Sequence, residues 1–451
     1  MTKQTLSVQD AMDHSRMGPW RWAAVALCFV VALLDGFDTQ SIAFIGTAIA
    51  GEFKLSATDM TWVITASTVG MAVGAMTLGT FGDRIGRKRT ILVALALFGA
   101  FSLAGAFASS AWQVVALRFL IGLGMGGATP ALLALTAEFS PRRRRGFLMT
   151  LVLLGLPGGA MIGGLVAAAW LPSVGWRGIF LIGGALPVVL LAAAVALLPE
   201  SPAFLVARGT PEADRRARAL IARATGQTVP DGTALTVENS GEKRGSVAAL
   251  FSPAYRTVTV AVWATYLFNW IAWYLLLLWM PTALKSLGLD ASTAALGTVT
   301  VNGAFILFAI PLSAVLPRVN ARTLLLGMFG AGILVALGLG ASGTNFGLVF
   351  TLIGVAGFGI GGQQLALNYL IANAYPTQLR ATATGWGIGV GRLGSIVGSA
   401  LGGVLLTGLG PSGYFAALAV PLVVAAAATL LVKAARTQTT DGELEAVVAS
   451  H

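Results

Sequence analysis

Two stretches of the chain repeat each other: GLGMGGATPALLALTAEFSPRRRRG (122–146) and GFGIGGQQLALNYLIANAYPTQLRA (357–381). They align without a gap from Gly122 over Gly357 onward, and ten of the 25 aligned positions are identical. Matches of Gly and Ala alone could arise by chance in so Gly-rich a chain. Pro141 and Arg145 also recur, as Pro376 and Arg380, at the same distance beyond the repeated glycines. We therefore infer that the chain consists of two homologous halves.

The composition places both halves in a membrane. Hydrophobic residues make up 56% of the 451 residues and charged residues only 10%, whereas soluble domains carry about 25% charged residues. A spanning helix needs about 20 apolar residues. Twelve segments are candidates, near 20–50, 61–82, 90–108, 112–138, 146–170, 177–198, 257–282, 292–316, 322–341, 346–374, 380–407 and 413–433. We predict an all-α integral membrane protein with 12 transmembrane helices in two pseudo-symmetric six-helix bundles.

The charge distribution predicts the orientation and the domain boundaries. If both termini are cytoplasmic, 24 of the 29 Lys and Arg residues lie on the cytoplasmic side, as the positive-inside rule expects. Thr210-Pro211 is a typical helix start and predicts a short amphipathic helix at about 211–225. The expected parts are a cytoplasmic tail (1–19), a first bundle (20–198), a cytoplasmic linker (199–256), a second bundle (257–433) and a cytoplasmic tail (434–451).

Several function classes are disfavoured by composition. The net charge of +11 comes from short basic bursts between apolar runs, a pattern that argues against a nucleic-acid partner. The two histidines, His14 and His451, lie at the termini, and Cys28 is the one cysteine. No motif for a metal site or an activated nucleophile is present, so we expect neither an enzyme nor a resident metal. Internal repeats that place a binding site at their interface are typical of secondary transporters.

Two carboxylates interrupt the first apolar segment, in VVALLDGFDTQSIAF (30–44). A charge at the bilayer centre costs about 2.5–3.5 kcal/mol on insertion scales. Asp35 and Asp38 are three residues apart and share one helix face. Carboxylates this close disfavour double ionisation, so we expect this pair to take up and release protons. Arg118, in the fourth segment, is the expected ion-pair partner. The alternatives are that the acids only bond neighbouring helices, or that the Asp–Arg pair is static.

The chain resembles the major facilitator superfamily over essentially its whole length. GTFGDRIGRKR (79–89) resembles its signature between helices two and three, with Phe81 in the usual Leu position. RFLIGLGMGG (118–127) resembles its helix-four element, and PESPAFL (199–205) the segment after helix six. The resemblance implies alternating access, in which two six-helix bundles rock around a midplane site. It also implies that the residue matching Arg118 takes part in proton coupling.

A narrower resemblance is to the aromatic acid:proton symporters of that superfamily. It rests on LDGFDTQ (34–40), WMPTALKSLGL (279–289) and YPTQLRATATGWGIGVGRLGSIVG (375–398). The resemblance implies uptake of a benzoate-like or phenylpropionate-like acid in bacteria, driven by the proton gradient without a cofactor. Some members carry a functionally important His in the second half. This chain has none there, so coupling through a histidine is excluded.

Arg392 is the expected anchor for a substrate carboxylate, because a guanidinium presents a planar fork that matches a carboxylate. Small residues surround it on its helix face. The alternative is an ion pair between helices. The walls of an aromatic pocket are expected from further aromatic and amide residues, each of which could equally be packing: Phe37, Asn269, Trp273, Gln363, Gln364, Asn368, Tyr369 and Trp386.

The resemblance also implies a cytoplasmic gate latch. Its expected members are glycines for close helix approach and charged residues for the latch itself: Gly79, Gly82, Asp83, Arg84, Gly86, Arg87, Glu138, Arg145 and Arg380. We expect a monomer in the bacterial inner membrane. The competing functions are a proton-coupled exporter of drugs or metabolites, loosely suggested by GLPGGAMIGG (155–164), and a carrier of another organic anion.

Overall fold

A computed structural model describes residues 5–226, 228–229, 233–237 and 246–432. The predicted C-terminal tail lies outside these ranges, and the side chain of Asp83 is not among those that the structure describes. The chain divides into two compact units: unit 1 comprises Met1–Phe53 and Ala66–Gly241, and unit 2 comprises Lys54–Thr65 and Glu242–His451. Each unit is described by itself below.

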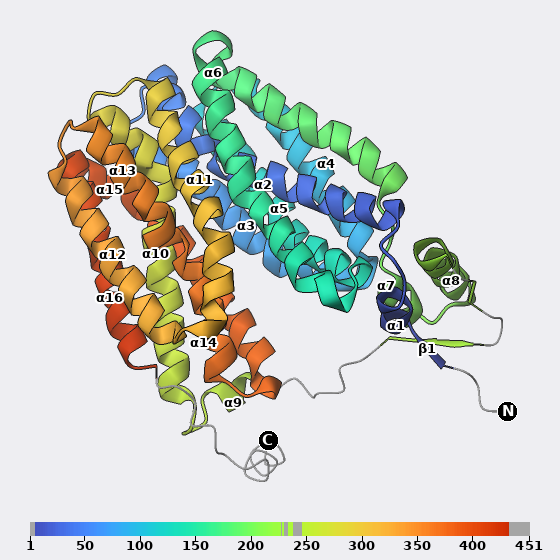
Figure 1. Cartoon of the computed structure of the whole chain (residues 1–451). Helices are drawn as coiled ribbons and strands as arrows, with labels where there is room; N and C mark the ends of the chain where they lie inside the picture. The colour runs from blue at the N-terminus through green and yellow to red at the C-terminus, as the bar shows by residue number, and fades with distance from the viewer. Residues whose placement is uncertain (1–4, 227, 230–232, 238–245, 433–451) are drawn as a thin grey trace. The chain divides into compact units, whose positions relative to one another are not determined.

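Unit 1 is built from helices and one small sheet (Figure 1). Its elements in chain order are β1 (Thr5–Ser7), α1 (Val8–Asp13), α2 (Pro19–Phe53), α3 (Ala57–Ile85, of which 57–65 belong to unit 2), α4 (Arg87–Gly105), α5 (Ala111–Phe139), α6 (Arg142–Leu197), α7 (Pro202–Ala207), α8 (Pro211–Thr225) and β2 (Ala234–Thr236). The two strands pair in parallel, with Thr5 opposite Ala234. The sequence pattern did not predict this sheet.

Unit 2 is helical throughout its described residues. Its elements are α9 (Val247–Leu250), α10 (Arg256–Ser286), α11 (Ala291–Val315), the 3₁₀ turn η1 (Leu316–Arg318), α12 (Ala321–Ala341), α13 (Phe346–Ala356), the π-helical segment η2 (Gly357–Gly361), α14 (Gln363–Ala374), α15 (Thr377–Ala417) and α16 (Ala419–Leu430). The predicted tenth spanning helix is therefore α13, η2 and α14 in succession. Its π-helical turn was not predicted, although such turns are frequent at functional sites.

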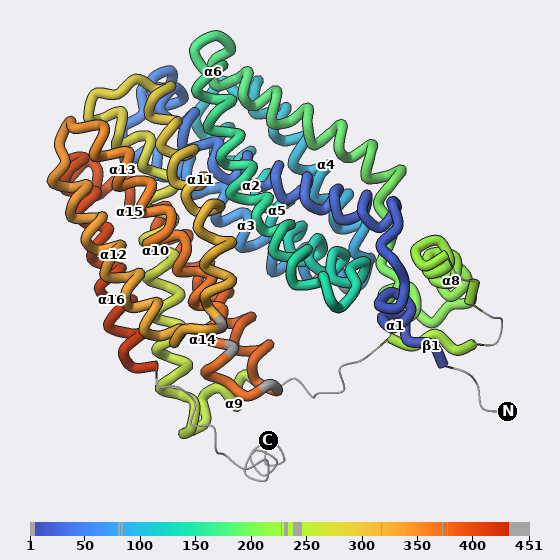
Figure 2. Tube along the Cα trace, viewed as in Figure 1, coloured from blue at the N-terminus to red at the C-terminus, as the bar shows by residue number. Residues whose placement is uncertain are grey.

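The structure confirms twelve spanning helices. Within the described residues, ten helical segments are long and apolar enough to cross a membrane. Two of them contain a glycine in the left-handed region, Gly175 (φ 63°) in α6 and Gly410 (φ 67°) in α15. Glycine adopts this conformation at little cost because it has no β-carbon. Each glycine separates two helices, and the trace of α6 shows the reversal as a loop (Figure 2).

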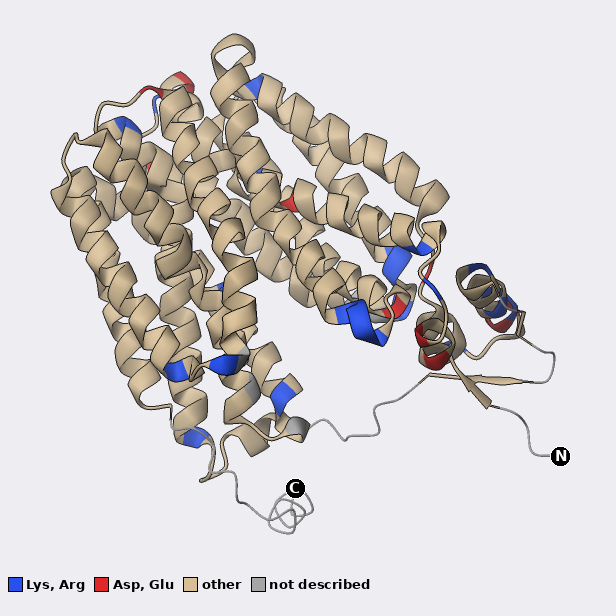
Figure 3. Ribbon diagram, viewed as in Figure 1, with Lys and Arg blue, Asp and Glu red and all other residues tan. Residues whose placement is uncertain are grey.

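The surfaces of the long helices suit lipid. Large apolar side chains such as Trp62, Met76 and Phe107 are exposed. Figure 3 shows that charged residues are sparse along the long helices and gather near helix ends. With the apolar spans, this identifies a multi-pass membrane protein.

The repeat seen in the sequence is also present in the backbone. Pro141 precedes α6 as its N-cap, and Pro376 precedes α15 in the same way. The breaks at Gly175 and Gly410 are separated by the same offset as these two prolines. The homology of the two halves therefore extends well beyond the two aligned stretches.

Repeated glycines bring helix backbones into contact at matching positions in each unit. In unit 1, a β-carbon on Gly122 would lie 2.1 Å from the carbonyl oxygen of Ser67, and one on Gly159 would lie 1.7 Å from that of Leu33. The counterparts in unit 2 are Gly357 against Val301, at 2.4 Å, and Gly394 against Leu267, at 2.2 Å. Both glycines recur at the offset of the sequence repeat, and both of their partners recur at an offset one position shorter. Such close approach is how helices associate in lipid, where the hydrophobic effect contributes little.

The linker contains the predicted amphipathic helix, α8, at Pro211–Thr225. The Thr210 hydroxyl accepts a hydrogen bond from the backbone N–H of Ala213, at 3.3 Å, and Gly226 ends the helix in the left-handed region. Ala213 and Ala217 on its apolar face pack against Leu205 of α7. Helix α8 is thereby fixed to unit 1.

The glycine contacts predict unequal effects at two adjacent positions in α6. Gly159→Ala would press a methyl group into the backbone of α2, and overpacking of this kind costs about 1–3 kcal/mol. Gly158→Ala is the matched control, because nothing lies within 4 Å of its β-carbon position. We expect thermal unfolding in detergent to show a lower midpoint for Gly159→Ala and little change for Gly158→Ala. Equal losses in both variants would contradict this account of the packing.

Candidate functional site

Two buried charged residues of unit 1, Asp38 and Arg118, form an ion pair between α2 and α5. A guanidinium nitrogen of Arg118 lies 2.9 Å from a carboxylate oxygen of Asp38. The same side chain donates to the Ser41 hydroxyl at 3.2 Å and to the Asp38 carbonyl at 3.3 Å. The side-chain exposures are 0% for Arg118 and 7% for Asp38. The predicted pairing of these two residues is present in the structure, and it is shielded from solvent.

Asp35 accepts hydrogen bonds from two threonine side chains. The hydroxyls of Thr39 and Thr129 donate to its two carboxylate oxygens, at 3.3 and 3.2 Å. Thr39 lies one turn further along α2, and Thr129 belongs to α5. The two acids of α2 thus bond different side chains of α5, since Asp38 contacts Arg118 and Asp35 accepts from Thr129. Thr129 was missed by sequence reasoning, since a Thr in an apolar helix gives no signal of its own.

The ion pair can respond to a proton. The buried Nε of Arg118 has no hydrogen-bond partner in the described part of the chain, so the guanidinium depends mainly on Asp38 and its neighbours. Protonation of Asp38 would remove the negative charge and leave Arg118 with the Ser41 hydroxyl and a backbone carbonyl. The arrangement is thus a buried charge pair whose strength depends on the protonation of one carboxylate.

Unit 2 contains a group of neutral polar side chains on α10 and α14 that bond one another. Tyr266 of α10 donates its hydroxyl to the amide oxygen of Asn368, at 2.6 Å. The Trp270 indole donates to the amide oxygen of Gln364, and its ring stacks on Tyr274 with centroids 5.7 Å apart. These contacts join α10 to α14, directly beyond the π-helical turn.

Two amide oxygens in this region have no partner. Asn269 is 1% exposed and Gln363 is fully buried. Their side-chain oxygens make no hydrogen bond to any described residue, although the Gln363 nitrogen donates to the carbonyl of Gly359. A buried acceptor without a donor is costly, by about 1–3 kcal/mol. Both oxygens are therefore suited to a ligand that brings hydroxyl or N–H donors.

The other predicted pocket residues are spread over both units. Arg392 is half-buried, and its carbonyl accepts from Ser395 at 2.7 Å. Trp273 packs against Phe305, with centroids 6.2 Å apart. Trp386 is 47% exposed and stacks on Trp263.

Two further predicted residues lie away from this group. Tyr369 lines a separate pocket of about 270 Å³ with Asn320 and Arg322. Phe37 is buried in unit 1, where its ring lies against the bare backbone of Gly163 and Gly183. The structure thus gathers Asn269, Gln363, Gln364 and Asn368 near α10 and α14, and leaves Phe37, Tyr369 and Trp386 elsewhere.

Of the predicted gate residues of unit 1, Arg87 lies beside Glu138, near the end of α5. The Ser201 hydroxyl donates to one carboxylate oxygen of Glu138, and Arg87 lies 4.0 Å from the other. Gly86 is left-handed (φ 103°), and a β-carbon there would lie 2.3 Å from a carboxylate oxygen of Glu200. Glycine is needed at this turn for both reasons.

Other members of the predicted gate have different surroundings. Arg145 lies 3.7 Å from Asp13 of α1, while Arg380 belongs to unit 2 and contacts the Tyr375 carbonyl at 3.5 Å. Arg84 is exposed, a β-carbon on Gly82 would touch Thr90, and Gly79 has open space around it. Their assignment to a gate stays a prediction.

Sequence reasoning missed the partners supplied by α1 and by the PESP segment. Glu200 accepts from the backbone N–H of Lys88 at 3.0 Å and of Ser201 at 2.9 Å. The quoted PESPAFL motif contained this signal. The pairing of Asp13 could not be found, because its short helix precedes the first spanning segment. Among the described residues, no group of three or more His, Cys, Asp or Glu side chains could hold a metal ion.

Comparisons with known proteins place this geometry in context. The family model for the Major Facilitator Superfamily matches residues 28–340 and 262–449. The chain is 36% identical to the gallate transporter of Pseudomonas putida over 429 residues, which cover 94% of each protein. It is 35% identical to the 4-hydroxybenzoate transporter PcaK of Pseudomonas aeruginosa over 434 residues, covering 95% of this chain and 96% of PcaK.

A solved structure supports the fold. The crystal structure of a D-xylose-proton symporter is similar with a TM-score of 0.72 and 18% sequence identity, covering 93% of this chain and 99% of the symporter. At this identity the likeness concerns the fold alone.

The ion pair predicts a specific pattern of stability. Arg118→Leu would leave the buried Asp38 carboxylate without a cation, and breaking a buried pair in this way costs about 3–5 kcal/mol. We expect a clearly lower unfolding midpoint in detergent, which should recover partly as the pH falls and Asp38 becomes neutral. The double variant Asp38→Asn/Arg118→Leu buries no charge at this site and should be more stable at neutral pH than Arg118→Leu. A single variant as stable as the unaltered protein at neutral pH would show that the pair contributes little.

Proposed function

The chain belongs to the Major Facilitator Superfamily, and we propose that it takes up a hydroxylated aromatic carboxylate together with protons by alternating access. It is a membrane transporter and not an enzyme. The observation that carries the coupling part of the proposal is the solvent-shielded pair of Arg118 and Asp38, with Asp35 one turn away. Ionisable groups inside a membrane span mark proton and substrate pathways.

Asp38 is proposed as the coupling group. An incoming proton would neutralise it and release Arg118, so that α2 and α5 could change their packing. Loss of the proton on the other side would restore the pair. Asp35, bonded by two threonine hydroxyls, would act as the neighbouring proton acceptor.

Unit 2 is proposed to recognise the substrate. The unpartnered oxygens of Asn269 and Gln363 are acceptors, and ring hydroxyls are donors. The relatives' names agree with this chemistry, since gallate and 4-hydroxybenzoate both carry ring hydroxyls. Arg392 would bind the carboxylate through its planar guanidinium. The substrate class we favour is therefore a hydroxybenzoate rather than an unsubstituted benzoate.

The cellular setting is part of the same proposal. The positive-inside bias of 24 among 29 Lys and Arg residues supports a bacterial inner membrane location with both termini in the cytoplasm. We propose that the transporter works as a monomer and that the proton gradient drives it without a cofactor.

The test is uptake into proteoliposomes under an imposed inward proton gradient. Labelled benzoate, 4-hydroxybenzoate, protocatechuate, gallate and 3-phenylpropionate would be compared with and without a protonophore. We expect protonophore-sensitive accumulation of one or more hydroxylated acids. Loss of preloaded acid in exchange for protons would indicate an exporter, and no movement of any acid by folded protein would contradict the proposal.

The carboxylates of α2 should be needed for accumulation. Asp38→Asn keeps the size of the side chain but cannot exchange a proton, so we expect proton-driven accumulation to fall at least tenfold while counterflow of labelled against unlabelled acid persists. Asp35→Asn should show a loss of the same kind. Asp59→Asn is the control, because Asp59 is an exposed helix-capping acid bonded to Ser56. Normal accumulation by both α2 variants would remove the coupling role.

Asn269 should discriminate between hydroxylated and plain rings. Asn269→Leu removes the acceptor but leaves an apolar surface of similar size, so KM should rise about tenfold for the preferred hydroxybenzoate and change little for benzoate. The control is Asn302→Leu, since Asn302 is equally buried but bonds to the Thr298 carbonyl of its own helix. Equal changes in KM for both acids would place Asn269 outside the recognition of the ring.

A further inference from the structure

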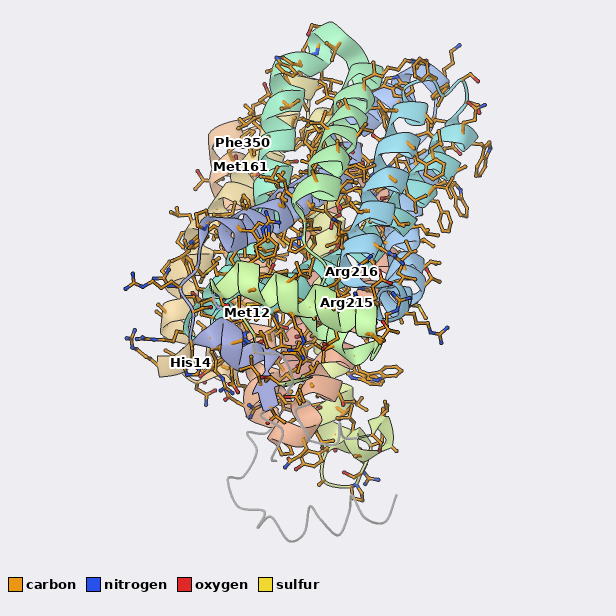
Figure 4. All side chains as sticks on the ribbon, turned by 90° about the vertical axis from the view of Figure 1, so that its right-hand side faces the viewer. Met12, His14, Met161, Arg215, Arg216 and Phe350 are labelled. Carbon is orange, nitrogen blue, oxygen red and sulfur yellow. The ribbon has the colours of Figure 1, made fainter. Side chains whose placement is uncertain are left out.

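A pocket of about 570 Å³ lies in unit 1 outside the site described above. It is bordered by the first turns of α4, the end of α6, the short helix α7 and one side of α8. In Figure 4, which labels Arg216, α8 runs across the direction of the long helices of unit 1, beside α1. The pocket therefore lies where membrane-spanning helices end, on the side that the Lys and Arg bias predicts to be cytoplasmic.

The lining of the pocket is strongly basic. Its charged residues are Lys88, Arg89, Glu200, Arg208, Arg216 and Arg223, five cations against one carboxylate. Arg216 is paired with Glu212 of the same helix, and the Lys88 ammonium donates to the carbonyl of Val195. The other three cations of the lining make no ion pair with a described residue.

Arg89, Arg208 and Arg223 are exposed, and none makes an ion pair with any residue that the structure describes. Arg223 lies over the Trp20 ring, 4.8 Å from its centroid. The three guanidiniums come from α4, the end of α7 and α8. They border one concave space and have no anionic partner there among the described side chains.

Apolar residues complete the pocket on the side of the spanning helices. Leu92 of α4, together with Ala196 and Leu197 of α6, is wholly or partly exposed and lines the same space. Trp20 borders it from the first turn of α2. An occupant that matches this lining needs an anionic head for the arginines and an apolar portion for the leucines.

We propose that this pocket binds the headgroup of an anionic phospholipid from the cytoplasmic leaflet. Its phosphate would lie among Arg89, Arg208 and Arg223, and its acyl chains would follow Leu92 and Leu197 into the bilayer. Basic pockets at this depth attract anionic lipid, because each basic residue near the surface adds to the attraction. The amphipathic α8, anchored through Ala213, Ala217 and Leu205, holds one wall of the pocket at the membrane surface.

A free phosphate could in principle satisfy the same arginines. The exposed leucines argue for lipid, because a small anion would leave their apolar surface in contact with water. The two occupants differ experimentally, since only the lipid depends on acyl chains and only the free anion competes at millimolar concentration in water.

The test is native mass spectrometry of the full-length protein in detergent, titrated with phosphatidylglycerol or with phosphatidylcholine. We expect saturable binding of phosphatidylglycerol in preference to phosphatidylcholine. The variant Arg89→Gln/Arg208→Gln removes two cations that make no ion pair among the described residues, and it should weaken phosphatidylglycerol binding about tenfold. Inorganic phosphate at millimolar concentration should not displace the lipid.

The matched control is Arg143→Gln/Arg144→Gln. It removes the same charge from exposed arginines at the start of α6 that do not line the pocket. We expect this variant to bind phosphatidylglycerol as the unaltered protein does. Equal weakening in both double variants would reduce the effect to net charge, and displacement by phosphate would identify a simple anion site. Either result would overturn the proposal.

Discussion

The structure depends on close contacts between helix backbones at glycine. In lipid the hydrophobic effect contributes little to the association of helices, so close packing at small residues has to stabilise it. Three glycines of unit 1, Gly122, Gly126 and Gly159, would each press a β-carbon to about 2 Å from a carbonyl oxygen. Two of their counterparts in the second half, Gly357 and Gly394, lie against the backbone of residues that correspond to the partners in the first half, whereas Gly361 lies against the ring of Trp273. The same backbone packing is therefore present in both halves at two of these three positions.

That correspondence shows where the halves differ. Asp35 and Asp38 lie on the same helix as the packing partner Leu33, and at the partners' offset they correspond to Asn269 and Ala272. Arg118 lies on the same helix as Gly122, and at the glycines' offset it corresponds to Ile353. The charged pair of unit 1 is thus replaced by apolar residues in unit 2, and the second acid by a neutral amide. The amide oxygen of Asn269, which has no partner among the described residues, occupies the position equivalent to Asp35. Equivalent positions therefore hold a carboxylate in one half and a neutral amide in the other.

The sequence predicts the features that are local or repeated. Hydropathy identified the twelve helices, and Thr210-Pro211 located α8. The Asp38–Arg118 pair followed from the cost of leaving either charge alone in a membrane. Features that depend on neighbours distant in the chain could not be predicted. Thr129 beside Asp35, Asp13 beside Arg145 and the pairing of β1 with β2 all join segments that are far apart in the sequence and carry no shared pattern.

The close packing and the charged pair are parts of one arrangement. Gly36 lies between the two acids of α2, and a β-carbon there would be 1.8 Å from the Leu156 carbonyl of α6. Each residue turns the helix by about 100°, so a face pressed against α6 at position 36 directs positions 35 and 38 elsewhere. Both acids bond side chains of α5, Thr129 and Arg118. A bulkier residue at position 36 would rotate or displace α2 and separate both acids from their partners. The glycine contact therefore sets the geometry of both carboxylates against α5.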